Sequence, residues 1–264
     1  MMEKGHEDIY SLPEYYDIAF DFRDVAAECT FMSDLFHRLH RRAPGGFLEL
    51  AAGPARHALE FARRGCAAIA LDCNEAMTTY TARSAEKAGV ELVTVCGDMV
   101  DFQLQHPVDM AALLMNSAVY LLTNETVLDH LDSVAGHLTD GGLYILEMAH
   151  PRDVFGTGTS THNQWRMEKD GTAVEMTWGR SDDAFDPVTQ IRQVTVTMSF
   201  KGPRGDGSII RAAPERCFTA NEVKALVAAS GRFELIIQYG AMDAGIPFTN
   251  DAIAWRMVSV LRKR

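Results

Sequence analysis

The chain has 264 residues, of which 47% are hydrophobic and 23% charged, and its 36 acidic and 25 basic side chains give a formal net charge of −11. This composition is typical of a soluble globular protein with a sizeable core. The acidic excess argues against nucleic acid as the main partner, because phosphate binding depends on clustered Lys and Arg.

Membrane, secretory and metal signals are missing from the sequence. No apolar run approaches a membrane span, the N-terminus lacks the apolar stretch of a secretory signal, and the five cysteines nowhere form Cys-x-x-Cys. We therefore expect a cytoplasmic protein with no membrane contact and no metal site. The oligomeric state stays open, a homodimer included.

Helix and strand patterns alternate through the first 150 residues. After a helix at 26–41, the expected elements are strand 47–51, helix 56–64, strand 67–71, a helix ending at 88, strand 92–96, strand 108–115, helix 124–137 and strand 143–148. The third and fourth strands are apolar without alternation, as expected for parallel strands covered on both faces. Serial βα units predict a doubly wound, mostly parallel α/β sheet.

The pattern changes after Pro151. Segments 165–169 and 173–178 flank Asp170-Gly171, which is a strong hairpin signal, and 194–200 alternates apolar and polar residues. We therefore expect an antiparallel β cap inserted after the fifth strand.

The chain then returns to the main sheet. A capping box from Thr219 to Glu222 opens a helix that ends near Gly231. Strands at 233–239 and 254–261 follow. The expected organisation is an N-terminal helical lid at 1–45, an α/β core at 46–151, the cap at 152–216, and a final helix and two strands at 217–264.

Polar residues follow several of the predicted strands at their C-terminal ends, where open α/β sheets bind ligands. They are Glu49 with the Gly53 turn, Asp72, Gly97-Asp98-Met99, and Met115-Asn116-Ser117 with Tyr120. An acid in such a place can also cap the following helix, so each feature alone admits two interpretations. Two carboxylates at one sheet edge suit a nucleoside: the first can meet an amine or lie behind the glycine turn, and the second can accept both ribose hydroxyls.

Taken together and in order, these features resemble the class I S-adenosylmethionine-dependent methyltransferases over residues 10–150. The resemblance implies a seven-stranded Rossmann-like sheet and S-adenosylmethionine as the cofactor. It places the methionine and ribose part at the first turn, the ribose hydroxyls at Asp72, the adenine amine near Asp98, and the sulfonium near the segment after the fourth strand. It implies cofactor contacts from Glu49, Ala51, Gly53, Ala55, Asp72, Cys73, Met77, Gly97, Asp98, Met99, Met115 and Tyr120.

The first turn departs from the pattern of the family. Where the family has acid-x-Gly-x-Gly-x-Gly, this chain has Glu49-Leu-Ala51-Ala-Gly53-Pro-Ala55. Because alanine suits negative φ and glycine suits positive φ or close ligand contact, we expect Gly53 to make the closest approach to the ligand. The missing glycines also count against a dinucleotide site, which needs them around a pyrophosphate. His57, one turn into the next helix, is either a further cofactor contact or a polar helix residue.

The N-terminal segment resembles that of the glycine and sugar amine N-methyltransferases, where this region closes over the cofactor. The resemblance implies that Tyr16 faces the sulfonium, that Tyr15 adjoins the cofactor, and that Arg23 pairs with the methionine carboxylate. The alternative is that the aromatic residues form an apolar staple and that Arg23 is a surface charge.

Three residues are candidates for catalytic roles: Tyr16, Asn116 and His150. His150 lies just beyond the fifth strand, where it could act as a general base or contact the acceptor, or could hold the loop before Pro151. Glu147 is a further candidate base. Trp165 and Trp178 are expected in the core of the cap, with walls of an acceptor pocket as the alternative.

The resemblance implies an enzyme that transfers a methyl group from S-adenosylmethionine to nitrogen or oxygen of a small-molecule acceptor. One alternative is a cyclase on the same fold, which forms a small ring from the cofactor's own aminobutyrate chain and releases methylthioadenosine. Another is a non-catalytic module that only binds the cofactor. The sequence does not identify the acceptor.

Overall fold

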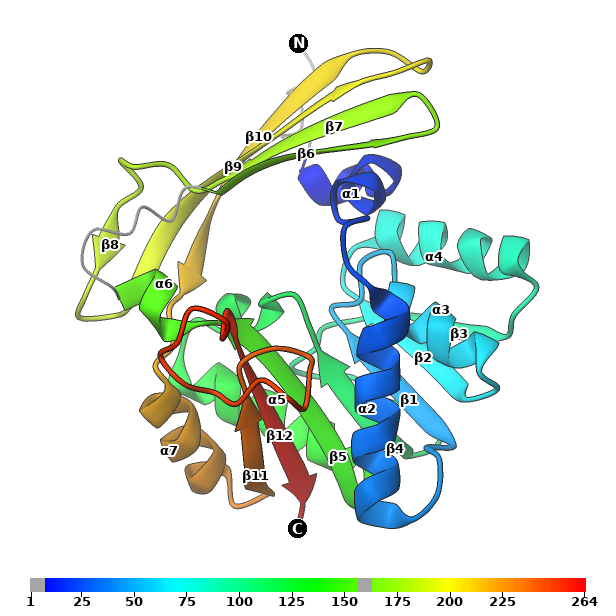
Figure 1. Cartoon of the computed structure of the whole chain (residues 1–264), viewed down its shortest axis with the longest axis vertical. Coiled ribbons are helices and arrows are strands. Elements are labelled where there is room, and N and C mark those ends of the chain that lie inside the picture. The colour runs from blue at the N-terminus through cyan, green and yellow to red at the C-terminus, as the bar shows by residue number, and fades with distance from the viewer. Residues whose placement is uncertain (1–7, 156–162) are drawn as a thin grey trace.

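The computed structural model describes residues 8–155 and 163–264, which build two sheets that face each other (Figure 1). The larger sheet has seven strands in the order β11-β12-β5-β4-β1-β2-β3. Its strands are β1 (Gly46–Leu50), β2 (Ala67–Asp72), β3 (Leu92–Cys96), β4 (Val108–Leu113), β5 (Leu138–Ala149), β11 (Phe233–Tyr239) and β12 (Arg256–Lys263). Only β12 runs against its neighbours, so the doubly wound, mostly parallel sheet is confirmed.

Helices cover both faces of this sheet. Because strand side chains alternate between faces, Phe47 and Leu48 of β1 belong to different core clusters. The cluster with Phe47 contains α2 (Val25–His40) and α3 (Arg56–Arg63), and the cluster with Leu48 contains α5 (Asn124–Gly136) and α7 (Ala220–Ser230). Among the described residues, no helix is both long and apolar enough to cross a membrane.

The helix boundaries agree with the capping signals in the sequence. The Asn74 side chain accepts hydrogen bonds from the first amides of α4 (Glu75–Ala88), and Gly89 ends that helix in the left-handed conformation. Thr219 and Glu222 form the predicted capping box of α7.

The second sheet is the antiparallel cap. It contains β6 (Asn163–Lys169), β7 (Thr172–Trp178), β9 (Ile191–Lys201) and β10 (Gly207–Arg216), with the short β8 (Phe185–Asp186) paired to β9. Asp170 and Gly171 both have positive φ, as a tight hairpin turn of this kind requires. The sequence did not predict β8 or β10.

The N-terminal segment joins the cap to the sheet below it. Helix α1 (Pro13–Ala19), which the sequence did not predict, lies beneath β6 and β7 and also contacts α4 (Figure 1). Its buried side chains pack against Val174, Met176 and Met198 of the cap. The chain then enters α2, which packs against the larger sheet. The N-terminal segment therefore contacts both sheets and connects them.

Two local features of the larger sheet concern the connection from β3 to β4 and the start of β5. Residues 97–107, all of which are described, contain no helix, so β3 and β4 are joined by a loop instead of a helical crossover. β5 begins at Leu138 and not at the predicted residue 143, and its pairing with β4 shifts register in this part of the strand. Gly142 is required there because a Cβ would lie 2.8 Å from the Thr139 carbonyl oxygen.

Candidate functional site

The turn after β1 brings three backbone residues with positive φ to the carboxyl edge of the sheet. They are Ala51 (φ 46°), Gly53 (φ 53°) and Ala55 (φ 52°). The expectation that the alanines would have negative φ is therefore wrong. An L-residue in this region costs roughly 1–2 kcal/mol. The turn is held by the Ala52 amide, which donates to the Leu71 carbonyl at 2.9 Å, and by Ala55, which is fully buried.

Replacing Ala51 by glycine should therefore stabilise the protein, by about 1 kcal/mol after the entropy of the unfolded chain is counted. Denaturant unfolding measures the change. Ala82→Gly, the same substitution on an exposed position of α4, should instead destabilise by about 0.5–1 kcal/mol. Equal losses in the two variants would contradict the strain assigned to Ala51.

Asp72 ends β2 beside this turn and is held by two backbone amides. Gly53 N donates to Oδ2 at 2.7 Å, and Asn74 N donates to Oδ1 at 2.8 Å. Burial raises the pKa of the carboxyl, although both hydrogen bonds lower it. Since each carboxylate oxygen has two lone pairs, one acceptor position remains on each oxygen. Asp72 can therefore accept hydrogen bonds from two neighbouring hydroxyls.

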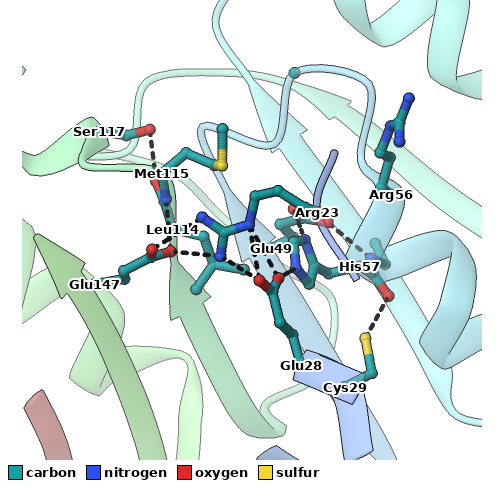
Figure 2. A network of polar contacts seen from close by, with 12 residues as sticks. Arg23, Glu28, Cys29, Glu49, Arg56, His57, Leu114, Met115, Ser117 and Glu147 are labelled. Carbon is teal, nitrogen blue, oxygen red and sulfur yellow. Dashed lines mark hydrogen bonds and ion pairs between the residues drawn. The ribbon is translucent and has the colours of Figure 1, made fainter. Parts of the chain in front are cut away.

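A chain of buried ion pairs lies behind the edge (Figure 2). The Arg23 guanidinium donates to both oxygens of Glu147, at 2.9 and 3.1 Å, and its Nε donates to Glu28 at 2.9 Å. His57 links Glu28, at 2.6 Å from Nε2, to Glu49, at 3.2 Å from Nδ1. These pairs tie the N-terminal segment to β1 and β5.

The charges in this chain are fixed by their partners. Burial opposes ionisation of Glu147, but Arg23 and Arg256 outweigh it and lower the pKa of the carboxyl to about 2. Burial also opposes protonation of His57, but the hydrogen bonds with Glu28 and Glu49 raise its pKa to about 9. At neutral pH Glu147 is therefore ionised but held by two guanidinium groups, which makes it a weak base, and the His57 imidazolium has no free nitrogen lone pair to accept a proton.

A cavity of about 580 Å³ separates the edge of the larger sheet from the cap. Aromatic side chains form much of its wall: Tyr10, Tyr16, Phe20, Phe22, Tyr120, Trp165, Trp178 and Trp255. Met115 and Asn116 from the end of β4 line it below, and Arg192 and Glu215 line it from the cap. The cavity thus receives residues from both sheets and from the N-terminal segment, and its size suits a small organic molecule.

Residues 47–142 match the family model described as a methyltransferase domain. This region of the chain is therefore similar to a methyltransferase domain. The match covers the strands and helices that build the carboxyl edge just described. A curated relative is the dTDP-3-amino-3,4,6-trideoxy-alpha-D-glucopyranose N,N-dimethyltransferase of Streptomyces venezuelae, 29% identical over 149 residues. That alignment covers 56% of this chain and 58% of the relative.

Solved structures of methyltransferases share the fold over nearly the whole chain. An S-adenosylmethionine-dependent methyltransferase from Clostridium acetobutylicum superposes with a TM-score of 0.75 at 12% identity, covering 94% of this chain and 96% of the other. CalS10, an amino pentose methyltransferase from Micromonospora echinaspora solved with S-adenosylmethionine bound, has a TM-score of 0.70 at 18% identity and covers 100% of both chains.

Several residues that the sequence placed at the site come together in the structure. Tyr16, Met115, Asn116 and Tyr120 all line the cavity. Met115 and Asn116 have φ of 57° and 65°, a strained conformation that is held by hydrogen bonds. The Met115 amide donates to Glu147 at 3.0 Å, and the Asn116 side chain accepts from Ala149 N at 2.8 Å. The Asn116 side-chain oxygen is thus engaged by a backbone amide, and a catalytic role for this residue stays a prediction.

Residues after β2 and β3 lie along the neighbouring part of the edge. Cys73 and Asp98 are exposed, and the Gly97 amide donates to the Asp72 carbonyl at 3.0 Å. The Asp98 side chain accepts from Val100 N at 2.9 Å, and the Met99 carbonyl accepts from His130 at 2.8 Å. Their contacts with a cofactor stay predictions.

Other expected site residues have structural roles. Tyr15 stacks on Phe200 of the cap with ring centroids 4.0 Å apart, and Met77 is buried in the core. Neither lines the cavity, and their contacts with a cofactor stay predictions. Arg23 is neither a surface charge nor free for a ligand carboxylate, because Glu28 and Glu147 occupy it. His57 joins two carboxylates, and Glu49 caps α3 by accepting from Ala58 N at 2.7 Å.

His150 is not placed as a catalytic base. It is buried outside the cavity wall, and its Nε2 lies 3.0 Å from the Thr249 carbonyl oxygen while Nδ1 accepts from Arg152 N. Both ring nitrogens are therefore occupied by backbone groups, which corresponds to the structural alternative for this histidine. Trp165 and Trp178 fulfil both roles that were considered, since they pack against the cap cluster and also line the cavity.

The sequence did not reveal three charged residues of the cavity wall, two from the cap and one from the larger sheet. Glu215 and Arg216 end β10, a strand whose weak alternation gave no signal, and Arg256 opens β12. All three line the cavity. An adjacent Glu-Arg pair just before the capping box was the only local hint, and it does not distinguish a surface from a cavity.

Proposed function

We propose that this protein transfers a methyl group from S-adenosylmethionine to nitrogen or oxygen of a small molecule held in the cavity. The observation that carries the proposal is the position of the cavity, which is lined from below by the end of β4 and closed from above by the cap. The names of two relatives, an amino-sugar N,N-dimethyltransferase and an amino pentose methyltransferase, favour an amine on a sugar-sized acceptor.

The residues present fit the cofactor. Asp72 has two acceptor positions left for the ribose hydroxyls, and a side chain at Gly53 would meet Tyr16 Cε1 at 3.9 Å, so the turn lies close beneath the cavity wall. Asp98 is exposed and can meet the adenine amine. When bound, S-adenosylmethionine supplies an electrophilic methyl group on a cationic sulfur.

The protein's own contribution is to position the acceptor. Burial raises the pKa of the Tyr16 hydroxyl, and the negative charges of Asp72 and Glu215 raise it further. The hydroxyl therefore stays protonated at neutral pH, and the Tyr16 ring lines the cavity beside the Gly53 turn. The aromatic walls exclude water and hold the acceptor in line with the methyl group and the sulfur. Such positioning can lower the activation barrier by up to roughly 7–11 kcal/mol.

Product analysis by mass spectrometry tests the proposal. The purified protein is incubated with S-adenosylmethionine alone and then with free and nucleotide-linked amino sugars. S-adenosylhomocysteine that forms only with an acceptor, together with an acceptor heavier by one or two methyl groups, is the expected result. Methylthioadenosine formed without an acceptor would indicate cyclisation instead, and binding with no turnover on any acceptor would indicate a sensing module.

A further inference from the structure

Glu215 is a buried carboxyl group with an unsatisfied oxygen at the cavity. It is 7% exposed, lines the cavity from the end of β10, and its Oε1 has no hydrogen-bond partner among the described residues. A buried carboxylate oxygen without a partner loses the full free energy of its hydration. Such a group is expected to meet its partner in a ligand.

The charged groups that face Glu215 are directed elsewhere. Arg192 on β9 is the cross-strand neighbour of Glu215 on β10, but its guanidinium lies over the Phe185 ring, 5.2 Å from the ring centroid. Arg211, four residues earlier on β10, contacts Asp8 at 3.3 Å and Tyr120 at 3.4 Å. Asp183 adds a negative charge nearby. Within the described residues, Glu215 forms no ion pair within 4.0 Å.

The next residue, Arg216, is also held away from Glu215. Its guanidinium donates to Asn124 and Glu222, both at 2.6 Å, and lies over the Phe218 ring. The negative oxygen of Glu215 is therefore available to a ligand and is not neutralised by the cations around it.

Aromatic rings line the same cavity as Glu215. Tyr16 and Phe20 have ring centroids 4.6 Å apart, and Phe20 meets Trp165 and Trp178 edge-on at 5.4 and 6.4 Å. The faces of such rings attract alkylammonium groups. A carboxylate beside several aromatic rings is a binding site for a cationic amine.

We propose that Glu215 binds the ammonium group of an amine acceptor and removes a proton from its nitrogen. The inference rests on the proposed function and narrows the acceptor to an amine. The N–H bond of the ammonium breaks, the proton moves to Glu215 Oε1, and the bonding pair stays on nitrogen. That lone pair then forms the new N–C bond while the S–C bond breaks and its electrons remain on sulfur. The product leaves as a methylated ammonium ion.

The acidity of Glu215 agrees with this role. Burial raises the pKa of the carboxyl to about 7, although Arg211, Trp178 and Arg192 lower it and Asp183 raises it further. A base with a pKa near the working pH is ionised when the acceptor enters and can still hold the proton that it takes. The Tyr16 and Tyr120 hydroxyls face it in neutral form, since burial raises the pKa of both.

The binding step is tested with choline and its neutral carbon isostere, 3,3-dimethylbutan-1-ol, by ligand-observed NMR at about pH 8 without S-adenosylmethionine. We expect the wild type to bind choline roughly fivefold or more tightly than the isostere, and Glu215→Gln to lose this preference. Glu175→Gln, the same substitution on an exposed position of the cap, should keep it. No preference in the wild type, or a preference retained in Glu215→Gln, would overturn the proposal. Because no turnover is needed, this failure is distinct from failure of the proposed function.

A pH titration of stability provides a second, independent readout. The folded-state pKa of Glu215 is raised above its usual 4.5 to about 7, so its ionisation weakens the fold as pH rises through this window. Glu215→Gln should therefore have a higher Tm than the wild type at about pH 8, and the difference should shrink toward pH 5. With an amine acceptor in hand, kcat of Glu215→Gln should fall by roughly 10²-fold or more. A Tm difference independent of pH, or an unchanged kcat, would contradict the role.

Discussion

Glu147→Gln should lower the free energy of unfolding by about 3–5 kcal/mol, because it leaves two buried guanidinium groups without a full counter-charge. Glu147 is 0% exposed, and its carboxylate meets Arg23 at 2.9 Å and Arg256 at 3.2 Å. Urea unfolding at neutral pH measures the loss. Glu234→Gln is the matched control, since its pair with Arg262 is half exposed and should contribute no more than about 1 kcal/mol.

The pH dependence distinguishes loss of charge from loss of packing. The pKa of Glu147 is lowered from 4.5 to about 2 in the folded protein, so its stabilising contribution is complete above 4.5 and is lost as pH falls through this window. The gap between the wild type and Glu147→Gln should therefore narrow on acidification from about pH 5 to pH 3. A gap that stays constant would mean that the variant is destabilised by altered packing.

Glu147→Gln should also disturb the conformation of the cavity floor. Glu147 accepts from the Met115 amide at 3.0 Å and so helps to hold the left-handed pair Met115–Asn116 at the cavity floor. The protein therefore uses a buried ion pair to fix a strained segment of its site. The sequence suggested Glu147 as a base, and the structure assigns it to support instead.

The fold was predictable because its signals are local. Turn residues, caps and apolar runs fixed most strands and helices of the larger sheet to within a few residues, and the hairpin at Asp170-Gly171 showed where the cap begins. The ion pairs were not predictable, because Arg23 and Glu147 are 124 residues apart in the chain and meet only through the packing of α2 against β5. Neither the residue type nor the spacing shows that the Arg23 guanidinium is already paired with Glu28 and Glu147.

Backbone conformation was hidden for a related reason. Alanine at positions 51 and 55 is not a residue that signals positive φ, and only the turn as a whole imposes it. The polar lining of the cap was also hidden, since the alternation of β10 is weak. The sequence therefore pointed to residues along the carboxyl edge of the larger sheet but not to the charged residues that the cap adds to the cavity.

Asp72→Ala should weaken S-adenosylmethionine binding by at least about tenfold, since two charge-assisted hydrogen bonds of roughly 1.5–3 kcal/mol each are lost. The expectation rests on the two acceptor positions that remain on the carboxylate after Gly53 N and Asn74 N have bonded to it. Isothermal titration calorimetry gives the affinity. Asp101→Ala, at an exposed acid after β3, should bind as the wild type does.

The loss of cofactor affinity must be distinguished from disruption of the turn after β1, because the Gly53 amide donates a hydrogen bond to Asp72. Asp72→Asn keeps an acceptor for that amide but has no negative charge and only one acceptor oxygen, so it should retain the Tm better than Asp72→Ala while still binding more weakly than the wild type. If both variants fold and bind S-adenosylmethionine with wild-type affinity, then Asp72 serves only to brace the turn, and the ribose must lie elsewhere along the edge.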